Sequence, residues 1–229
     1  LPALVAAAAL LTDYILTVSV SISSGVAQIV SAFPEMSDFR VPISVGLVMF
    51  VMIINLRGVK ESGIAFAFPT YFFLGTMFLT VGIGFFRYLA GNLGLVVDPP
   101  HLEAPQVLQP ITMFLLLRAF ASGTTTLTGV EALSNGITAF KEPRSRNAGI
   151  TLIWMAGILA TLMLGIFFLA HFTSAIPSET ETVISQLART IFNGRGLPYL
   201  AVITGTTVIL VLAANTAFAD FPRLSALVA

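Results

Sequence analysis

Six apolar stretches, separated by short polar segments, make up most of this 229-residue chain. A helix needs roughly 20 apolar residues to cross the hydrocarbon core of a bilayer, and most of the stretches are that long. A chain that crosses hydrocarbon must satisfy its own backbone hydrogen bonds, which helices do. The sequence therefore predicts an all-α integral membrane protein. The expected spans are about 3–32, 42–56, 64–89, 110–140, 148–172 and 198–218.

The positions of Lys and Arg predict how these spans are oriented. Two short basic turns, 57–62 and 141–146, fall on the same side of the membrane if all six stretches cross it. The arginines on the opposite side are spread over much longer connections. Short basic loops remain in the cytoplasm, so we expect both turns to be cytoplasmic. Apolar residues at helical spacing within 180–193 predict an amphipathic helix on the outer side, lying on the membrane surface or capping the bundle.

Composition excludes several classes of protein. The chain has no cysteine, which rules out disulfides and thiolate metal sites. Its formal net charge is zero, so we expect no nucleic acid partner. The two histidines, His101 and His171, form no metal-ligand pattern, and no nucleophile–base pair or phosphate loop is present, so we expect neither an enzyme nor a cofactor. The chain opens on Leu1-Pro2 without an initiator Met or a basic leader, so we expect it to be part of a longer protein.

The fourth stretch, 110–140, is the least regular part of the sequence. It is too long for one span and contains three consecutive threonines at 124–126, followed by Thr128, Gly129 and Glu131. Irregular backbone at membrane depth is tolerated only where it faces protein or water, and β-branched residues disfavour a helix. We therefore predict a helix that is broken within the membrane. For Thr125 and Thr126 alone, hydroxyl bonding to the preceding turn is the simpler interpretation.

A stripe of polar residues runs along the first span. Its members, spaced as one face of a helix, are expected to face the interior of the bundle. Carboxylate and hydroxyl oxygens suit a small cation or a proton. We therefore predict that the first span and the broken helix share a site for the transported ion. The stripe comprises Asp13, Thr17, Ser21, Ser24 and Gln28, and the site residues are Asp13, Thr17, Ser21, Thr128 and Glu131.

Three alternatives remain open at this point. A broken helix offers carbonyls to a cation and amides to an anion, so the ligand is either a bare cation or a zwitterion. Arg118, the only base deep within an apolar stretch, provides a structural alternative in which it neutralises one of the acids. Asp220 and Arg223 follow the last span three residues apart and are predicted to form a cytoplasmic gate, although a capped helix end explains them equally well.

Several motifs resemble the amino acid–polyamine–organocation superfamily. The turn Asn-Leu-Arg-Gly at 55–58 and the turn Lys-Glu-Pro-Arg at 141–144 are typical of the superfamily as a whole. Thr-Gly-Val-Glu-Ala-Leu-Ser-Asn-Gly at 128–136, together with Ala-Asp-Phe-Pro-Arg at 219–223, is more similar to the KimA-type bacterial potassium importers of the KUP group. The resemblance implies a LeuT-type inverted-repeat transporter fold with a discontinuous helix, of which this chain supplies about the third to eighth spans.

The resemblance also implies a function. It is proton-coupled potassium uptake by alternating access in the bacterial inner membrane, with potassium at Thr17, Ser21 and Thr128. Asp13 would supply charge and Glu131 would carry the coupled proton. The expected partners are the lipid bilayer, potassium ions and protons, and a second copy in a homodimer of the full-length protein. The alternatives are a proton-coupled amino acid permease of the same superfamily and a membrane scaffold that transports nothing.

Overall fold

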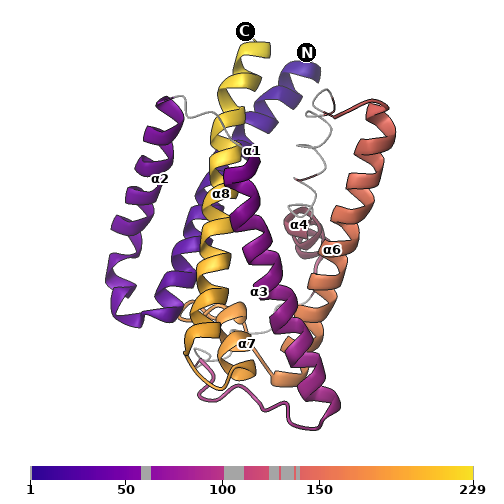
Figure 1. The fold of residues 1–229 in the computed structure, drawn as a ribbon. Coiled ribbons are helices and arrows are strands. Elements are labelled where there is room, and N and C mark those ends of the chain that lie inside the picture. Colours follow the sequence, from indigo (N-terminus) through magenta and orange to yellow (C-terminus); the bar gives the residue numbers. More distant parts are fainter. Residues whose placement is uncertain are drawn as a thin grey trace. The chain divides into compact units, whose positions relative to one another are not determined.

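The computed structural model describes residues 2–57, 63–100, 111–123, 129, 137 and 140–228. Every regular element within these ranges is a helix, so the predicted all-α fold class is confirmed. The chain divides into two compact units, one made of Leu1–Pro100 with Ile166–Ala229 and the other of His101–Gly165. Figure 1 labels the helices of both units.

Five helices in the described ranges are long and apolar enough to cross a membrane. The candidate spans within them are Ala8–Ala32, Pro34–Leu56, Phe66–Leu89, Arg144–Thr173 and Leu197–Pro222. A multi-pass membrane protein follows from their number and hydropathy. The corresponding helices are α1 (Pro2–Ala32), α2 (Arg40–Leu56, preceded by the 3₁₀-helix η1, Pro34–Phe39), α3 (Gly63–Leu89), α6 (Arg144–Thr173) and α8 (Leu197–Val228).

The last helix is longer than the sequence indicated. α8 continues through Pro222 to Val228, past the expected end at Phe218. A proline usually ends a helix because it lacks an N–H and its ring crowds the preceding turn, but helices in membranes tolerate it. Asp220 therefore lies inside a continuous helix, and the interpretation of Asp220 and Arg223 as a capped helix end is wrong.

The amphipathic helix expected within 180–193 is α7, Val183–Ile191. It begins at Thr182, whose side chain accepts a hydrogen bond from the backbone N–H of Ser185. Its inner face is buried and packs on α1, α3 and α8. In Figure 1, α7 lies at the end of α1 and α8 that is opposite to the chain termini. α7 therefore packs against one end of these helices.

The pair α1 and α8 forms the centre of the first unit. A Cβ atom added at Gly25 of α1 would lie 3.6 Å from the carbonyl oxygen of Thr207 in α8, so the two backbones approach closely there. Beside this contact, three residues of α1 form an apolar cluster with Ala214 of α8. The three are Ile22, Val26 and Val30.

Gly205 marks a second close approach, where α8 crosses α3. A Cβ atom at this position would lie 3.1 Å from Thr76 Oγ1 and 3.4 Å from the Cα atom of Phe73. We expect Gly205→Leu to lower the free energy of unfolding by about 1–3 kcal/mol, because the larger side chain must separate the two helices. Gly205→Ala should have a much smaller effect, since only the Thr76 hydroxyl has to move. Thermal unfolding of both variants in detergent measures the difference, and equal melting temperatures would contradict this packing.

The second unit contains α4, Met113–Gly123, and most of α6. α4 has 11 residues, which at 1.5 Å per residue is about half of a bilayer core. Arg118 lies in α4 and its side chain is exposed. The threonines at 124–126, which favour the expected break, lie outside the described residues, and so do Thr128 and Glu131. Gly129 is described, and a Cβ atom there would lie 3.4 Å from the sulfur of Met155 in α6.

Candidate functional site

Three of the predicted site residues, Asp13, Thr17 and Ser21, lie on one face of α1, which is helical throughout. Ser21 is buried, while Asp13 and Thr17 are half-buried. Within the part of the chain that the structure describes, neither Asp13 nor Thr17 makes a hydrogen bond or an ion pair. Their oxygen atoms are therefore not used to hold the described helices together.

The continuity of α1 limits which of these residues can share an ion. At 1.5 Å per residue, neighbouring candidates are about 6 Å apart along the helix axis, and Asp13 and Ser21 are about 12 Å apart. Oxygen ligands lie about 2.3–2.6 Å from Ca²⁺ and somewhat farther from larger cations. A single ion can thus contact Thr17 together with either neighbour, but it cannot contact both Asp13 and Ser21. Thr17 is the residue common to both arrangements.

The depth of the three residues follows from the same arithmetic. The span that contains them ends at Ala32. Along the axis Ser21 lies about 16 Å from that end, near the middle of a core that is about 30 Å thick. Asp13 lies about 28 Å from the same end, close to the opposite boundary. The hydroxyl groups are therefore near the midplane and the carboxylate near one membrane surface.

The end of the polar stripe near Ala32 has a structural role. Gln28 Oε1 accepts a hydrogen bond of 2.9 Å from the Thr182 hydroxyl, and Ser31 Oγ accepts one of 3.0 Å from the Thr182 N–H. Both residues are buried, at 6% and 1% exposure. Gln28 thus holds the start of α7 on α1.

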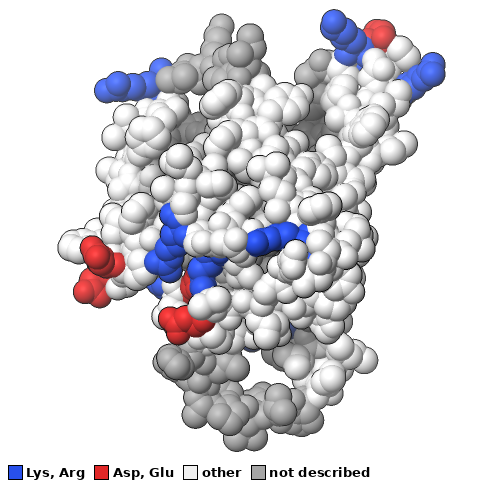
Figure 2. All heavy atoms as spheres, turned by 60° about the horizontal axis from the view of Figure 1, so that its bottom comes forward, with Lys and Arg blue, Asp and Glu red and all other residues white. Residues whose placement is uncertain are grey.

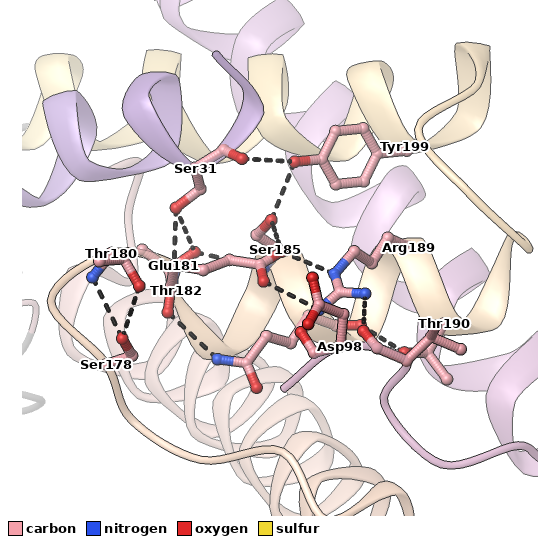
Figure 3. A network of polar contacts seen from close by, with 12 residues as sticks. Ser31, Asp98, Ser178, Thr180, Glu181, Thr182, Ser185, Arg189, Thr190 and Tyr199 are labelled. Atoms are coloured by element: carbon pink, nitrogen blue, oxygen red, sulfur yellow. Dashed lines mark hydrogen bonds and ion pairs between the residues drawn. The ribbon is translucent and has the colours of Figure 1, made fainter. Parts of the chain in front are cut away.

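Sequence reasoning missed a buried polar network around α7 (Figure 3). Arg189 donates from Nε to Glu181 Oε1 at 2.9 Å and from Nη2 to Oε2 at 3.0 Å. The exposed fractions of these side chains are only 14% and 10%. The Ser185 hydroxyl donates to Glu181 Oε1 at 2.8 Å and lies 2.9 Å from the Tyr199 hydroxyl. In the sequence, this network is indicated only by Glu181 and Arg189, which carry opposite charges and are eight residues apart. They lie on either side of the start of α7.

One of the motifs that carry the resemblance, the turn at 55–58, is joined to α8 in the structure. The side-chain amide of Asn55, at the end of α2, donates a 2.8 Å hydrogen bond to Asn215 Oδ1 in α8. Asn215 is buried, at 8% exposure. The two asparagines therefore join α2 to α8. Hydrogen bonds of this kind between membrane helices contribute about 0.6 kcal/mol to stability on average.

A cavity beside α1 has none of the candidate residues among its described lining residues. It has a volume of about 510 Å³, lies between α1, α2 and α8, and has mainly apolar walls. Asp220 is half-buried in α8, between Phe218 and Phe221, which both line this cavity. The side chain of Arg223 is not among the side chains that the structure describes. The described lining residues are Tyr14, Ile15, Val18, Ser19, Val48, Ala217, Phe218, Phe221 and Pro222.

Comparison with known proteins gives a consistent result. Residues 1–229 match the family described as amino acid permease. The potassium transporter KimA of Bacillus subtilis is 46% identical to this chain over 224 residues, which is 98% of the chain and 36% of that protein. Low affinity potassium transport system proteins Kup from Pectobacterium atrosepticum and Pectobacterium carotovorum are each 29% identical over 161 residues, or 68% of the chain and 23% of their own length. The chain thus covers 36% of the length of KimA and 23% of the length of each Kup protein.

Proposed function

Because this chain belongs to the amino acid permease family, for which a LeuT-type fold is implied, we propose that it is part of a proton-coupled potassium importer that works by alternating access. The 46% identity to a potassium transporter supports potassium as the substrate. A transporter of this kind is not an enzyme. It needs no cofactor and handles only the transported potassium ions and protons.

The observation that supports the site best is the polar face of α1, with Asp13 and Thr17 unbonded within the described residues. Potassium would lose its water shell and bind to the hydroxyl oxygens of Thr17 and Ser21, about one helical turn apart near the midplane. Thr128 of the broken helix would complete this set. Asp13, one turn from Thr17, would supply negative charge, and Glu131 would carry the coupled proton.

The variant Thr17→Val tests the site, because valine keeps the shape of threonine and lacks its hydroxyl. In the full-length protein, this change should raise the KM for potassium about tenfold, which corresponds to about 1.4 kcal/mol of binding free energy. The maximal rate should change much less. Uptake of labelled rubidium into proteoliposomes measures both quantities.

Ser19→Ala is the matched control for this test. Ser19 lies on an exposed face of the same helix, and its hydroxyl donates to the carbonyl of Ile15 at 2.9 Å. Its removal should leave the KM within about twofold of the starting protein, since surface substitutions change free energies by about 0.5 kcal/mol or less. An unchanged KM in Thr17→Val would remove Thr17 from the site.

A proton-coupled amino acid permease is the second candidate, because the matching family is described by that activity. In that case the amide end of the broken helix would bind the carboxylate of the substrate. Glu131 and the potassium transporters among the relatives favour the ion. A membrane scaffold is third, since an acid such as Glu131 within a stretch that is expected to cross the membrane gives a scaffold no advantage.

We also propose a location and an assembly. The protein would lie in the bacterial inner membrane, with the basic turns 57–62 and 141–146 in the cytoplasm. α7 and the Ala32 end of α1 would then face outward. The full-length protein would form a homodimer. The spans expected from the sequence would form part of one transporter domain.

A further inference from the structure

A groove runs along α1 beside α2 and α8. It consists of two cavities, the one of about 510 Å³ between α1, α2 and α8, and a second of about 270 Å³ between α1 and α2. Val48 of α2 lines both cavities, so they adjoin. No Lys, Arg, Asp or Glu is among the described residues that line them. The groove therefore offers no ionic partner to a charged ligand along its walls.

The groove is open toward the outside of these helices. Three apolar residues on its walls, Ile15, Val45 and Met49, are exposed at 57%, 57% and 47%. Figure 2 shows a surface without described Lys, Arg, Asp or Glu between the charged side chains near α7 and those at its upper edge. An exposed apolar surface on membrane-spanning helices is typical of contact with hydrocarbon. The groove is thus accessible to lipid from this side.

The length of the groove matches one leaflet of a bilayer. Its wall on α1 runs from Tyr14 to Ser23, which is about 14 Å at 1.5 Å per residue. Ser23 lies about 14 Å from the end of the span at Ala32, near the midplane of a core that is about 30 Å thick. Tyr14 lies about 27 Å from Ala32, close to the opposite boundary. The groove therefore extends from the midplane to one membrane surface, which is the depth of one acyl chain.

A basic side chain lies at the surface end of the groove. Arg57 directly follows the end of α2, which lies at the same end of the unit as the start of α1 (Figure 1). Asn55, two residues earlier, is bonded to Asn215 of α8, and Ala217, two residues after Asn215, lines the larger cavity. Arg57 is exposed and forms no ion pair within the described ranges. Its guanidinium is therefore accessible to a phosphate at the membrane surface.

The groove and the proposed ion site lie on different faces of α1. At 3.6 residues per turn, the wall residues Val18 and Ile22 lie about 100° and 140° around the helix from Thr17. Asp220 of α8 lies about 160° around its own helix from Phe218, which lines the larger cavity. Its carboxylate is thus not on the wall of the groove, where it would repel a phosphate. A molecule in the groove contacts α1 from behind the ion site.

From this geometry we propose that the groove binds one anionic phospholipid, from the leaflet on the side of Arg57. An acyl chain fills the two cavities, because apolar cavities accept apolar molecules and exclude water. The headgroup phosphate pairs with Arg57, whose planar guanidinium forms bidentate bonds to phosphate. With the basic turns in the cytoplasm, as proposed, this is the leaflet that carries anionic lipids. The inference goes beyond the proposed function, because lipid binding does not depend on which substrate is transported.

Lipid binding to the full-length protein in a neutral detergent tests this site. Phosphatidylglycerol and phosphatidylcholine with identical acyl chains are titrated separately, and native mass spectrometry counts the bound molecules. We expect the first phosphatidylglycerol to bind about fivefold more tightly than phosphatidylcholine, since one basic residue near the membrane surface contributes about 1 kcal/mol. Arg57→Gln should abolish this preference. Arg146→Gln, which changes an exposed arginine of the other short basic turn, should preserve it.

Val48→Phe tests the position of the acyl chain, because the ring occupies the place where the two cavities adjoin. It should weaken the binding of both lipids about tenfold, the equivalent of two fewer buried CH₂ groups. Its melting temperature without lipid shows whether it is folded, and Arg57→Gln, an exposed substitution, tests the proposal independently.

Three results would overturn the lipid site. Val48→Phe that is folded and binds both lipids as tightly as the starting protein would exclude the groove. A preference for phosphatidylglycerol that persists in Arg57→Gln would exclude the headgroup position. A starting protein that binds neither lipid would indicate that another part of the full-length chain fills the groove.

Discussion

Replacing Glu131 with Gln in the full-length protein should abolish proton-coupled potassium uptake. Gln has nearly the shape of Glu and cannot exchange a proton, so the substitution separates proton coupling from packing. Glu131 lies outside the described residues, and its proposed role rests on the cost of a carboxylate within an apolar stretch of sequence that is expected to cross the membrane. We expect rubidium uptake driven by an imposed pH gradient to fall to about the level of empty vesicles, consistent with an essential proton carrier.

Glu142→Gln is the matched control for this substitution. Glu142 lies in the basic turn 141–146, where its exposed side chain pairs with Arg144 at 3.2 Å on the surface. Exposed ion pairs contribute little, so this variant should transport normally. If Glu131→Gln takes up rubidium at the normal rate across the whole pH range, Glu131 does not carry the proton.

Glu181→Ala should be among the most destabilising single substitutions in the described part of the chain. It leaves the guanidinium of Arg189, which is only 14% exposed, without its carboxylate partner. Removing one member of a buried pair typically costs about 3–5 kcal/mol, because the remaining charge is uncompensated. We expect a large fall in the melting temperature of the purified protein, measured in detergent.

Two further variants show whether the ion pair itself causes this loss. Glu179 is an exposed acid two residues before Glu181, and Arg40 binds its backbone carbonyl rather than its carboxylate. Glu179→Ala should therefore change the free energy of unfolding by about 0.5 kcal/mol or less. The double variant Glu181→Leu/Arg189→Met should lose less than Glu181→Ala, because apolar replacement of a whole buried pair is often neutral. A Glu181→Ala protein as stable as the Glu179→Ala protein would contradict the structural role of the pair.

The helical architecture could be predicted because it depends on local properties of the chain. The length and hydropathy of the apolar stretches define membrane spans without knowledge of their neighbours. The period of apolar residues within 180–193 defines α7 in the same way. The end of α8 was misplaced because Pro222 usually ends helices, whereas this helix continues through it.

The polar network around α7 could not be predicted, because it joins residues far apart in the sequence. Ser31 and Thr182 are separated by 151 positions, and no local pattern pairs them. Gln28 belongs to the same helical stripe as Thr17 and Ser21, so its type and spacing fitted an ion site equally well. Only the packing of α7 on α1 shows that Gln28 holds the start of α7.

Of the proposed site residues, the structure describes only Asp13, Thr17 and Ser21 of α1. The helical rise of α1 places Thr17 between Asp13 and Ser21, so that Thr17 can share an ion with either neighbour. This refinement follows from the continuity of a helix that the sequence already predicted. The proposal for Thr128 and Glu131 rests on the sequence and on the resemblance alone.

The identity of the substrate is tested most directly by transport into proteoliposomes that contain the full-length protein. Labelled rubidium and a set of labelled amino acids would be offered separately, with and without an inward proton gradient. We expect saturable rubidium uptake that the gradient stimulates and unlabelled potassium inhibits, with no amino acid uptake above empty vesicles. Uptake of an amino acid without uptake of rubidium would contradict the proposed function.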